Sequence, residues 1–176
     1  MTSLNHIPYR SALFLKNTHS GFEDIKSFGA DWYFIDIEDG VPPGMKNEAR
    51  DLISTKLQGG TFEGLRTLVR LNGLEDREEL EKDLKLIPHK SVDGFILPKL
   101  HNIEDMRIFE GLIAQTEAKL GLKERYFSLV PTLETSSAIL NAFDIVNSSP
   151  RIIAVFFGHA DMVLDMHSDN TWESLY

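Results

Sequence analysis

The sequence predicts an α/β fold in which parallel strands curve into a TIM-type (β/α)8 barrel. Two observations favour this fold. Short apolar runs alternate with longer amphipathic stretches, which is the sequence form of repeated βα units. Polar or charged residues follow nearly every apolar run, as they do at the catalytic face of such barrels. We count about six βα units along the chain.

Six apolar runs are expected to form the strands, and all but one are rich in β-branched or aromatic residues. A helical stretch separates each run from the next with short connections, so the strands should lie parallel to one another. The strands are predicted at residues 11–15, 32–37, 67–71, 94–98, 127–131 and 152–157.

Five stretches with apolar residues at helical spacing are expected to form helices between these strands. Pro43 and Asp76 stand where two of them begin, and both residue types suit helix starts. Gly29, Gly59, Gly60 and Gly121 follow helical stretches, as C-terminal stops should. The helices are predicted at residues 22–28, 43–57, 77–87, 103–120 and 136–146.

The residues after the strands favour a barrel over an open doubly wound sheet. A dinucleotide-binding sheet usually carries G-x-G-x-x-G after its first strand, whereas the first run here is followed by Lys16, Asn17 and Thr18. An open sheet would also concentrate polar groups near one crevice. Here they are spread over all six strand ends, at Lys16, Asp36, Glu38, Arg70, Asn72, Lys99, Glu134 and Asp161.

Length and composition predict one domain over residues 1–176. With 42% hydrophobic residues the chain can bury one substantial core, and its net charge of -9 argues against binding nucleic acid or an anionic membrane. The absence of cysteine excludes disulfides and thiolate metal sites. No secretory signal and no apolar run near the roughly 20 residues of a membrane span are present, so we expect a cytoplasmic protein with a small-molecule partner.

Two acidic residues are candidate metal ligands. Glu134 and Asp161 each lie just past an apolar run, and Arg70 lies at the same relative place in another. If these runs are strands of one barrel, the three residues converge at one rim. Mg²⁺ prefers hard oxygen ligands and keeps several waters, so one or two carboxylates suffice. Glu134 and Asp161 fit that need; the alternative is that each is an ordinary solvated loop carboxylate.

Arg70 is the candidate substrate clamp. Strand alternation places Leu68, Arg70 and Asn72 on one face, and a guanidinium aimed into the barrel mouth can hold a carboxylate with two parallel hydrogen bonds. The alternative is a structural ion pair with Asp36 or Glu38, and both roles can coexist.

The acidic residues after the second strand are candidate supporting groups. Asp36 and Glu38 share a face, whereas Asp39 points away or starts the loop. Crowded carboxylates resist simultaneous ionisation unless a cation lies near them. Glu38 and Asp39 are therefore expected to support catalysis by orienting Arg70 or metal-bound water, with a loop-stabilising acidic cluster as an equally favoured alternative.

Two further residues are candidate substrate contacts. Lys99 ends the fourth strand, where an electrostatic or structural role is favoured over a Schiff base because a metal site makes the covalent route unnecessary. Thr135 follows Glu134 at a helix start, where free backbone N–H groups can receive an anion. Capping of that helix is the favoured alternative for Thr135.

Six motifs in order resemble the citrate lyase β-subunit family of the HpcH/HpaI aldolase superfamily. They are RSALFL, DWYFIDIEDGVPPGMKNEAR, LVRLNG, ILPKL, LETSSAIL and FGHADMVLDM, and the match runs from Arg10 to Tyr176. VRLN or LPK alone would be a weak signal. The order and spacing of all six make the resemblance specific.

The resemblance implies a TIM barrel that cleaves or forms carbon–carbon bonds with Mg²⁺, commonly on acyl-CoA thioesters of hydroxy diacids. It implies that the acids at Glu134 and Asp161 bind the metal and that Arg70 binds the keto-acid carboxylate. It also puts coenzyme A binding in question, because the family often has Pro-Gly after the first strand and Glu before the metal Asp. Here those positions are Lys16-Asn17 and Ala160.

The resemblance also implies an incomplete barrel, since family members usually continue through two more strands. Six units would leave an open edge along the sixth strand unless a partner chain or a further segment closes the sheet. Dimerisation, a fragment and a truncated reading frame are the open explanations, and a homo-oligomer is the partner that we expect. The expected activity is cleavage of a citryl-, malyl- or citramalyl-CoA type substrate or of a free 4-hydroxy-2-keto acid. The alternatives are a catalytically deficient barrel fragment with a binding or assembly role, and a phosphoenolpyruvate-type mutase on the same barrel.

Overall fold

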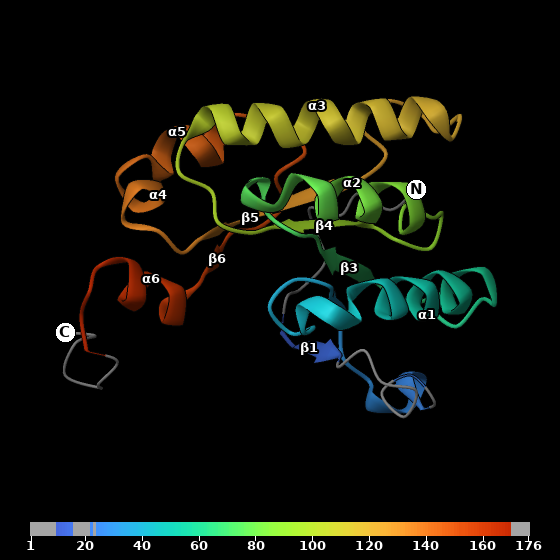
Figure 1. The fold of residues 1–176 in the computed structure, drawn as a ribbon. Helices are drawn as coiled ribbons and strands as arrows, with labels where there is room; N and C mark the ends of the chain where they lie inside the picture. Colours follow the sequence, from blue (N-terminus) through green and yellow to red (C-terminus); the bar gives the residue numbers. More distant parts are fainter. Residues whose placement is uncertain (1–9, 16–21, 23, 170–176) are drawn as a thin grey trace.

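A computed structural model describes residues 10–15, 22 and 24–169 of the 176. Its centre is one sheet of six parallel strands that lie side by side in chain order (Figure 1). This order and direction confirm the α/β expectation. The strands are β1 (Ala12–Leu15), β2 (Trp32–Asp36), β3 (Thr67–Arg70), β4 (Gly94–Leu97), β5 (Ser128–Leu133) and β6 (Phe156–Phe157).

Helical segments follow the strands at nearly the expected places. The helix expected at 22–28 is a single 3-10 turn, and the one expected at 136–146 divides in two at Asn141. A short helix also follows β6. The segments are η3 (Ile25–Phe28), η4 (Pro43–Met45), α1 (Lys46–Gln58), η5 (Leu74–Asp76), α2 (Arg77–Leu86), α3 (Ile103–Lys119), α4 (Ser136–Leu140), α5 (Ala142–Asn147) and α6 (His159–Asp165).

The predicted capping residues lie where the helices begin and end. The Asp76 carboxylate accepts a hydrogen bond from the Glu79 amide at the start of α2. Gly29 and Gly121 follow η3 and α3 with φ of 64°, a left-handed conformation that favours glycine. Asp76 thus begins α2, whereas the two glycines mark the ends of η3 and α3.

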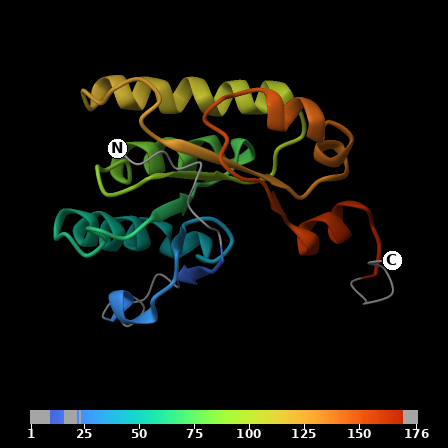
Figure 2. The ribbon, with the colours of Figure 1, turned by 180° about the vertical axis from the view of Figure 1, so that it is seen from behind.

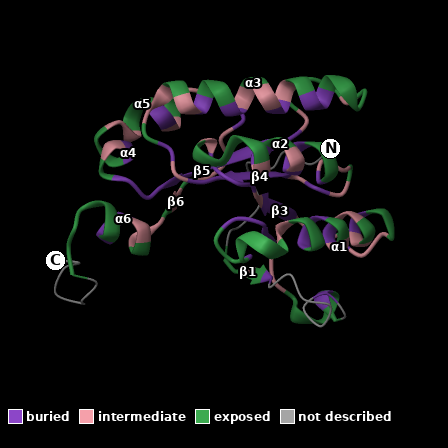
Figure 3. Ribbon diagram, in the orientation of Figure 1, coloured by how far each residue is buried: buried purple, intermediate pink, exposed green. Residues whose placement is uncertain are grey.

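Two apolar cores lie on the two faces of the sheet, because alternate side chains of each strand point in opposite directions. The larger core fills the space between the sheet and helices α1, α2 and α3 (Figure 3). The smaller core covers the inner face. It consists of Trp32, Phe34, Leu68, Ile96 and Val130.

The sheet curves strongly about its inner face. β1 and β6 are at opposite ends of the strand order, and five inter-strand spacings would separate them by roughly 24 Å in a flat sheet. The ring centroids of Phe14 in β1 and Phe156 in β6 are nevertheless 6.5 Å apart, and both rings contact Phe34. The six strands therefore form a half-barrel with an aromatic cluster inside.

The β6 edge of the half-barrel is much less buried than the rest. The strand expected at residues 152–157 forms a ladder only at Phe156–Phe157, with one isolated bridge between Ile152 and Leu129. Phe157, Leu164 and Met166 on this edge are each at least 60% exposed. Figures 1 and 2 show α6 on the β6 side of the sheet, away from α1 and α3.

The helices of the described residues lack the combination of length and hydrophobicity that crossing a membrane requires.

Candidate metal and substrate site

Nearly all the predicted site residues lie along one rim of the half-barrel. In a parallel sheet the carboxyl ends of all strands meet at the same edge, so residues far apart in sequence come together there. Arg70 ends β3, Lys99 follows β4, Glu134 follows β5, and the acidic cluster follows β2. Lys16, Asn17 and Thr18, which were expected at the end of β1, lie outside the described residues.

Arg70 makes the ion pairs that were its alternative role. Its Nε donates to Asp36 Oδ1 at 2.8 Å, one terminal nitrogen donates to Asp36 Oδ2, and the other lies 3.0 Å from Glu38 Oε2. Burial alone would lower the pKa of Arg70, but the hydrogen bond and charge of Asp36 outweigh it and raise the pKa. The guanidinium is thus held charged at the rim by two acids.

Asp36 is fixed from its other side by the loop that follows β2. Its two carboxylate oxygens accept hydrogen bonds from the backbone amides of Glu38 and Gly40, both at 3.0 Å. A Cβ at Gly40 would lie 2.3 Å from an Asp36 oxygen, so the absence of a side chain there lets the loop close over the carboxylate. The backbone of residues 38–40 therefore orients the acid that orients Arg70.

Lys99 is paired with the acids of the same loop. Its ammonium lies 2.6 Å from Glu38 Oε1 and 3.2 Å from Asp39 Oδ1. Burial raises the pKa of Glu38 despite the opposing effects of Lys99 and Arg70. Burial would lower the pKa of Lys99, but the Glu38 hydrogen bond raises it. The lysine is therefore held protonated, which agrees with an electrostatic role and not with a Schiff base.

The backbone of Lys99 joins this cluster to Glu134. Lys99 has φ of 50°, which is uncommon for a residue with a side chain. In this conformation its amide donates to Glu134 Oε1 at 2.6 Å while its side chain reaches Glu38. One residue thus contacts two acids of the rim through different groups.

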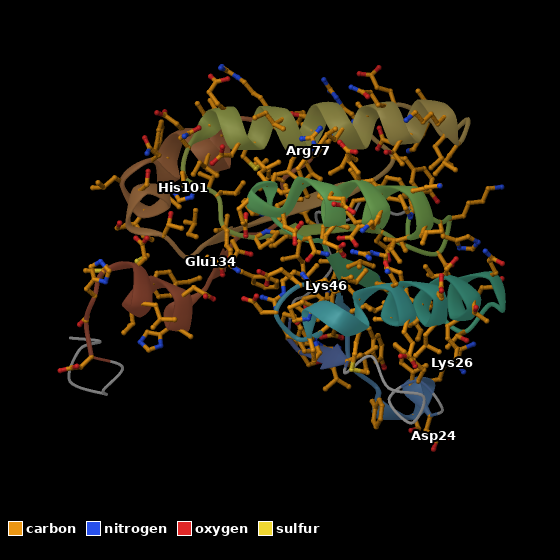
Figure 4. The ribbon with its side chains drawn as sticks, viewed as in Figure 1. Asp24, Lys26, Lys46, Arg77, His101 and Glu134 are labelled. Atoms are coloured by element: carbon orange, nitrogen blue, oxygen red, sulfur yellow. The ribbon has the colours of Figure 1, made fainter. Side chains whose placement is uncertain are left out.

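Glu134 is a buried carboxyl in negative surroundings (Figure 4 labels it at the rim). Burial, and then the negative charges of Asp161 and Glu38, raise its pKa to about 7, against the lowering effect of the Lys99 amide and Arg70. Gly158 lies directly against it, since a Cβ on Gly158 would be 2.4 Å from Glu134 Oε2 and 2.5 Å from its Cβ. The approach of α6 to Glu134 requires that glycine.

Asp161 lies in the first turn of α6 and is half-buried, close enough for its charge to act on Glu134. No group of three or more histidine, aspartate or glutamate side chains in the described part of the chain is arranged to hold a metal ion. A cation between Glu134 and Asp161 would therefore have two protein carboxylates and take its other ligands from water or substrate. Mg²⁺ is commonly bound in this way, so the two residues fit it.

Thr135 uses its hydroxyl within the fold. Oγ1 accepts from the Ala138 amide at 3.0 Å and donates to the Leu100 carbonyl at 2.8 Å. The capping alternative is thus present in the structure, and a substrate contact by Thr135 stays a prediction.

A buried polar chain supports the rim next to Arg70, and sequence reasoning missed it. Arg50 and Asp83 are fully buried and joined at 2.6 Å between Nε and Oδ1. The other Asp83 oxygen accepts from both the amide and the side chain of Asn72 at 2.8 Å, and Lys46 donates to Asn72 Oδ1. The signal in the sequence was the arginine on the apolar face of the helix at 43–57, which requires a buried acid.

Comparisons with known proteins agree on one family. The sequence profile of the family described as HpcH/HpaI aldolase/citrate lyase matches residues 10–174. A citrate lyase subunit beta from Leuconostoc mesenteroides subsp. cremoris is 30% identical over 85% of this chain and 49% of its own length. An L-malyl-CoA/beta-methylmalyl-CoA lyase from Rhodobacter capsulatus is 29% identical over 82% of this chain and 46% of its own.

The fold is also similar to that of solved structures. Protein CitE from Mycobacterium tuberculosis, solved in complex with magnesium and acetoacetate, superposes with a TM-score of 0.68 at 18% identity, over 97% of this chain and 62% of that one. The chain spans about half the length of the curated relatives it matches.

Proposed function

The chain belongs to the HpcH/HpaI aldolase/citrate lyase family, and we propose that it is the site-bearing part of a Mg²⁺-dependent carbon–carbon lyase on a (β/α)8 barrel. The barrel is supported by the strand order, by the contact between the β1 and β6 aromatic rings, and by the roughly double length of the curated relatives. The substrate is a hydroxyacyl-CoA of the citryl, malyl or citramalyl type, or a free 4-hydroxy-2-keto acid.

Glu134 and Asp161 are the proposed ligands of the cation. The pKa of the buried Glu134 carboxyl stays near neutrality although the charge of Arg70 lowers it, and a divalent cation would add the positive charge that the site needs. When bound, the cation acts as a Lewis acid on the substrate oxygen next to the bond that breaks. Protein CitE from Mycobacterium tuberculosis was solved in complex with magnesium, which supports this choice of metal.

Arg70 is the proposed clamp for the substrate carboxylate. A guanidinium has five N–H donors, and the hydrogen bonds to Asp36 use one on Nε and one on a terminal nitrogen, while the other terminal nitrogen forms an ion pair with Glu38. One donor on each terminal nitrogen is left for a carboxylate without breaking either ion pair. The two acids thus orient the arginine while it binds, so both roles proposed for it coexist.

Glu38, Asp39 and Lys99 are proposed to set the charge of the site. Lys99 offsets the two acids and places its amide on Glu134, which holds one oxygen of that ligand in place. Thr135 stabilises the turn after Glu134, where the backbone starts a helix. During cleavage the hydroxyl proton of the substrate must leave as the carbon–carbon bond breaks, and none of these residues is assigned that task.

The observation that carries this proposal is the meeting of Arg70, Lys99 and Glu134 at one rim, with Asp161 acting on Glu134 from α6. The test is metal-dependent cleavage of citramalyl-CoA, malyl-CoA, citryl-CoA and free 4-hydroxy-2-keto acids. Wild type should turn over one of them, whereas Glu134→Gln and Asp161→Asn should lose activity. Asp144→Asn on exposed α5 is the matched control and should not. Turnover unaffected by the first two substitutions would refute the metal ligands.

A second function is favoured by the exposed apolar edge. Phe157 in β6, the shortest strand, is 60% exposed, and Leu164 in α6 is 69% exposed. In a catalytically deficient barrel unit that binds or assembles with another copy through this edge, these side chains would be exposed in the single chain and covered in the assembly. Folded protein that turns over none of the substrates and forms an oligomer in sedimentation experiments would favour this alternative.

A further inference from the structure

Helix α6 is attached to the sheet through an unusually short strand. The ladder between β5 and β6 covers only Phe156 and Phe157, and α6 begins two residues later. Met162 and Val163 are buried and hold one face of the helix by apolar packing. Such packing is non-directional, so it leaves the rotation of the helix and its exact placement to polar contacts.

Two polar contacts join α6 to the chain on either side of Glu134. At the start of α6 the Gly158 amide donates to the Leu133 carbonyl at 3.0 Å. At its end one Asp165 oxygen accepts from both the amide and the hydroxyl of Ser136, at 2.7 and 2.5 Å. The segment 133–136, which carries Glu134, is therefore bonded to both ends of α6.

Asp165 lies on the same face of α6 as the proposed ligand. Residues four apart in an α-helix lie one above the other, and Asp161 precedes Asp165 by four. A contact that holds Asp165 against Ser136 therefore also turns Asp161 toward Glu134, two residues before that serine. The hydrogen bonds from Ser136 also lower the pKa of Asp165, so the accepting group is a carboxylate at neutral pH.

We propose that Asp165 is a positioning residue. Its two hydrogen bonds from Ser136, which we call the clasp, set the separation of Glu134 and Asp161 and so the affinity of the site for a divalent cation. The inference rests on the metal site of the proposed function. Asp165 itself does not touch the cation. It acts on the site through the rotation of α6.

Mn²⁺ binding measured by calorimetry tests the clasp, with Mn²⁺ as a probe that carboxylates bind as they bind Mg²⁺. Asp165→Ala should weaken binding about 10-fold, in the range seen when a partner of a metal ligand is lost. Asp165→Asn keeps an acceptor oxygen in the same place and should stay within about 3-fold of wild type. Asp169→Asn removes a nearby exposed charge without a clasp and should change nothing.

The other side of the clasp can be removed cleanly. Ser136 is the first residue of α4, a position where proline fits a helix, and Thr135 before it has φ of -122° and ψ of 151°, as residues before proline do. Ser136→Pro removes both donors and should match Asp165→Ala in Mn²⁺ affinity. Circular dichroism and melting without metal check that each variant is folded.

The outcomes separate this inference from the proposed function. Equal losses in Asp165→Ala, Asp165→Asn and Asp169→Asn would show a general charge effect and overturn the clasp. Unchanged affinity in Asp165→Ala and Ser136→Pro, with binding lost in Glu134→Gln, would overturn the clasp and leave the metal site standing. Wild type that binds no Mn²⁺ would overturn both.

Discussion

The two ends of the candidate site differ in how their charges are compensated. At the end formed by β2, β3 and β4, which we call the paired corner, Asp36, Glu38, Arg70 and Lys99 neutralise one another through direct contacts. At the end formed by β5 and α6, which we call the acidic corner, burial and then the negative charges of Asp161 and Glu38 raise the pKa of Glu134 to about 7. The paired corner is complete as folded, whereas the acidic corner needs a proton or a cation.

This difference separates what the fold supplies from what a ligand must supply. In the paired corner Arg70 and Lys99 lie beside the acids and oppose the burial that raises the pKa of Glu38. In the acidic corner the Lys99 amide and the charge of Arg70 also oppose the effect of burial, but the pKa of Glu134 still rises. Substitutions should therefore have opposite effects in the two corners: removal of a charge should destabilise the paired corner and stabilise the metal-free acidic corner.

The largest effect is expected for Arg70→Ala. It leaves Asp36 and Glu38, which are 8% and 3% exposed, without their arginine, and an uncompensated buried charge costs about 3–5 kcal/mol. Urea unfolding at neutral pH measures the loss. Arg107→Ala, which breaks an exposed pair with Glu104, is the control and should cost about 1 kcal/mol or less. If Arg70→Ala and Arg107→Ala lose the same free energy of unfolding, then the ion pairs of the paired corner stabilise the fold no more than an exposed surface pair does.

The acidic corner should show the opposite sign, together with a pH dependence. The Glu134 pKa is about 7 in the folded chain and 4.5 ordinarily, so the folded chain holds the extra proton between these values. The free energy of unfolding without metal should then fall as pH rises from about 4.5 to 7, by up to about 3 kcal/mol from this group.

Glu134→Gln should lack that contribution, so it should become more stable than wild type as pH approaches 7. Denaturant titrations at pH 5, 6, 7 and 8 without metal measure the difference. Glu48→Gln on exposed α1 is the matched control and should follow wild type. If the difference in unfolding free energy between Glu134→Gln and wild type is constant over this range, then the folded chain does not raise the pKa of Glu134.

Much of the fold could be predicted from the sequence because each strand and its polar end are signalled by a short, continuous segment of residues. The apolar runs gave the strands to within about two residues except at β6, and the parallel direction followed from the helices between them. Two helices differed for local reasons. In segment 22–28 the single 3-10 turn Ile25–Phe28 ends at Gly29, which has φ of 64°. The side chain of Asn141 donates to the Ser137 and His101 carbonyls at the point where the other helix divides.

The rim positions of the candidate residues could be predicted, whereas the contacts between them could not. Strand ends identify Arg70, Lys99 and Glu134, since parallel strands bring their ends together. Nothing in a lysine signals φ of 50°, and so the amide contact of Lys99 with Glu134 could not be foreseen. The Asp165–Ser136 clasp joins residues 29 apart, and its partner depends on where α6 lies.

A divalent cation should offset the free-energy cost of the ionised carboxylates in the acidic corner. At 100 times its dissociation constant, a ligand that binds only the folded chain stabilises it by about 2.7 kcal/mol. Binding requires ionised carboxylates, so the effect of Mg²⁺ on the melting temperature should be larger at pH 8 than at pH 6. Glu134→Gln should show no Mg²⁺ effect at either pH, and Arg70→Lys should retain it. A shift that is independent of pH would place the cation elsewhere.

The smallest expected effect comes from one methyl group. Gly158→Ala places a Cβ within 2.5 Å of the Glu134 side chain, including its Cβ, so α6 must move back or Glu134 must turn. Overpacking of this kind costs about 1–3 kcal/mol, and the displacement should also weaken Mn²⁺ binding. Gly111→Ala in α3 adds the same group with nothing within 4 Å and should gain up to about 1 kcal/mol in a helix. If Gly158→Ala binds Mn²⁺ like wild type, then α6 can withdraw from Glu134 without cost to the site, and the close approach seen at the acidic corner is not what prepares it for a cation.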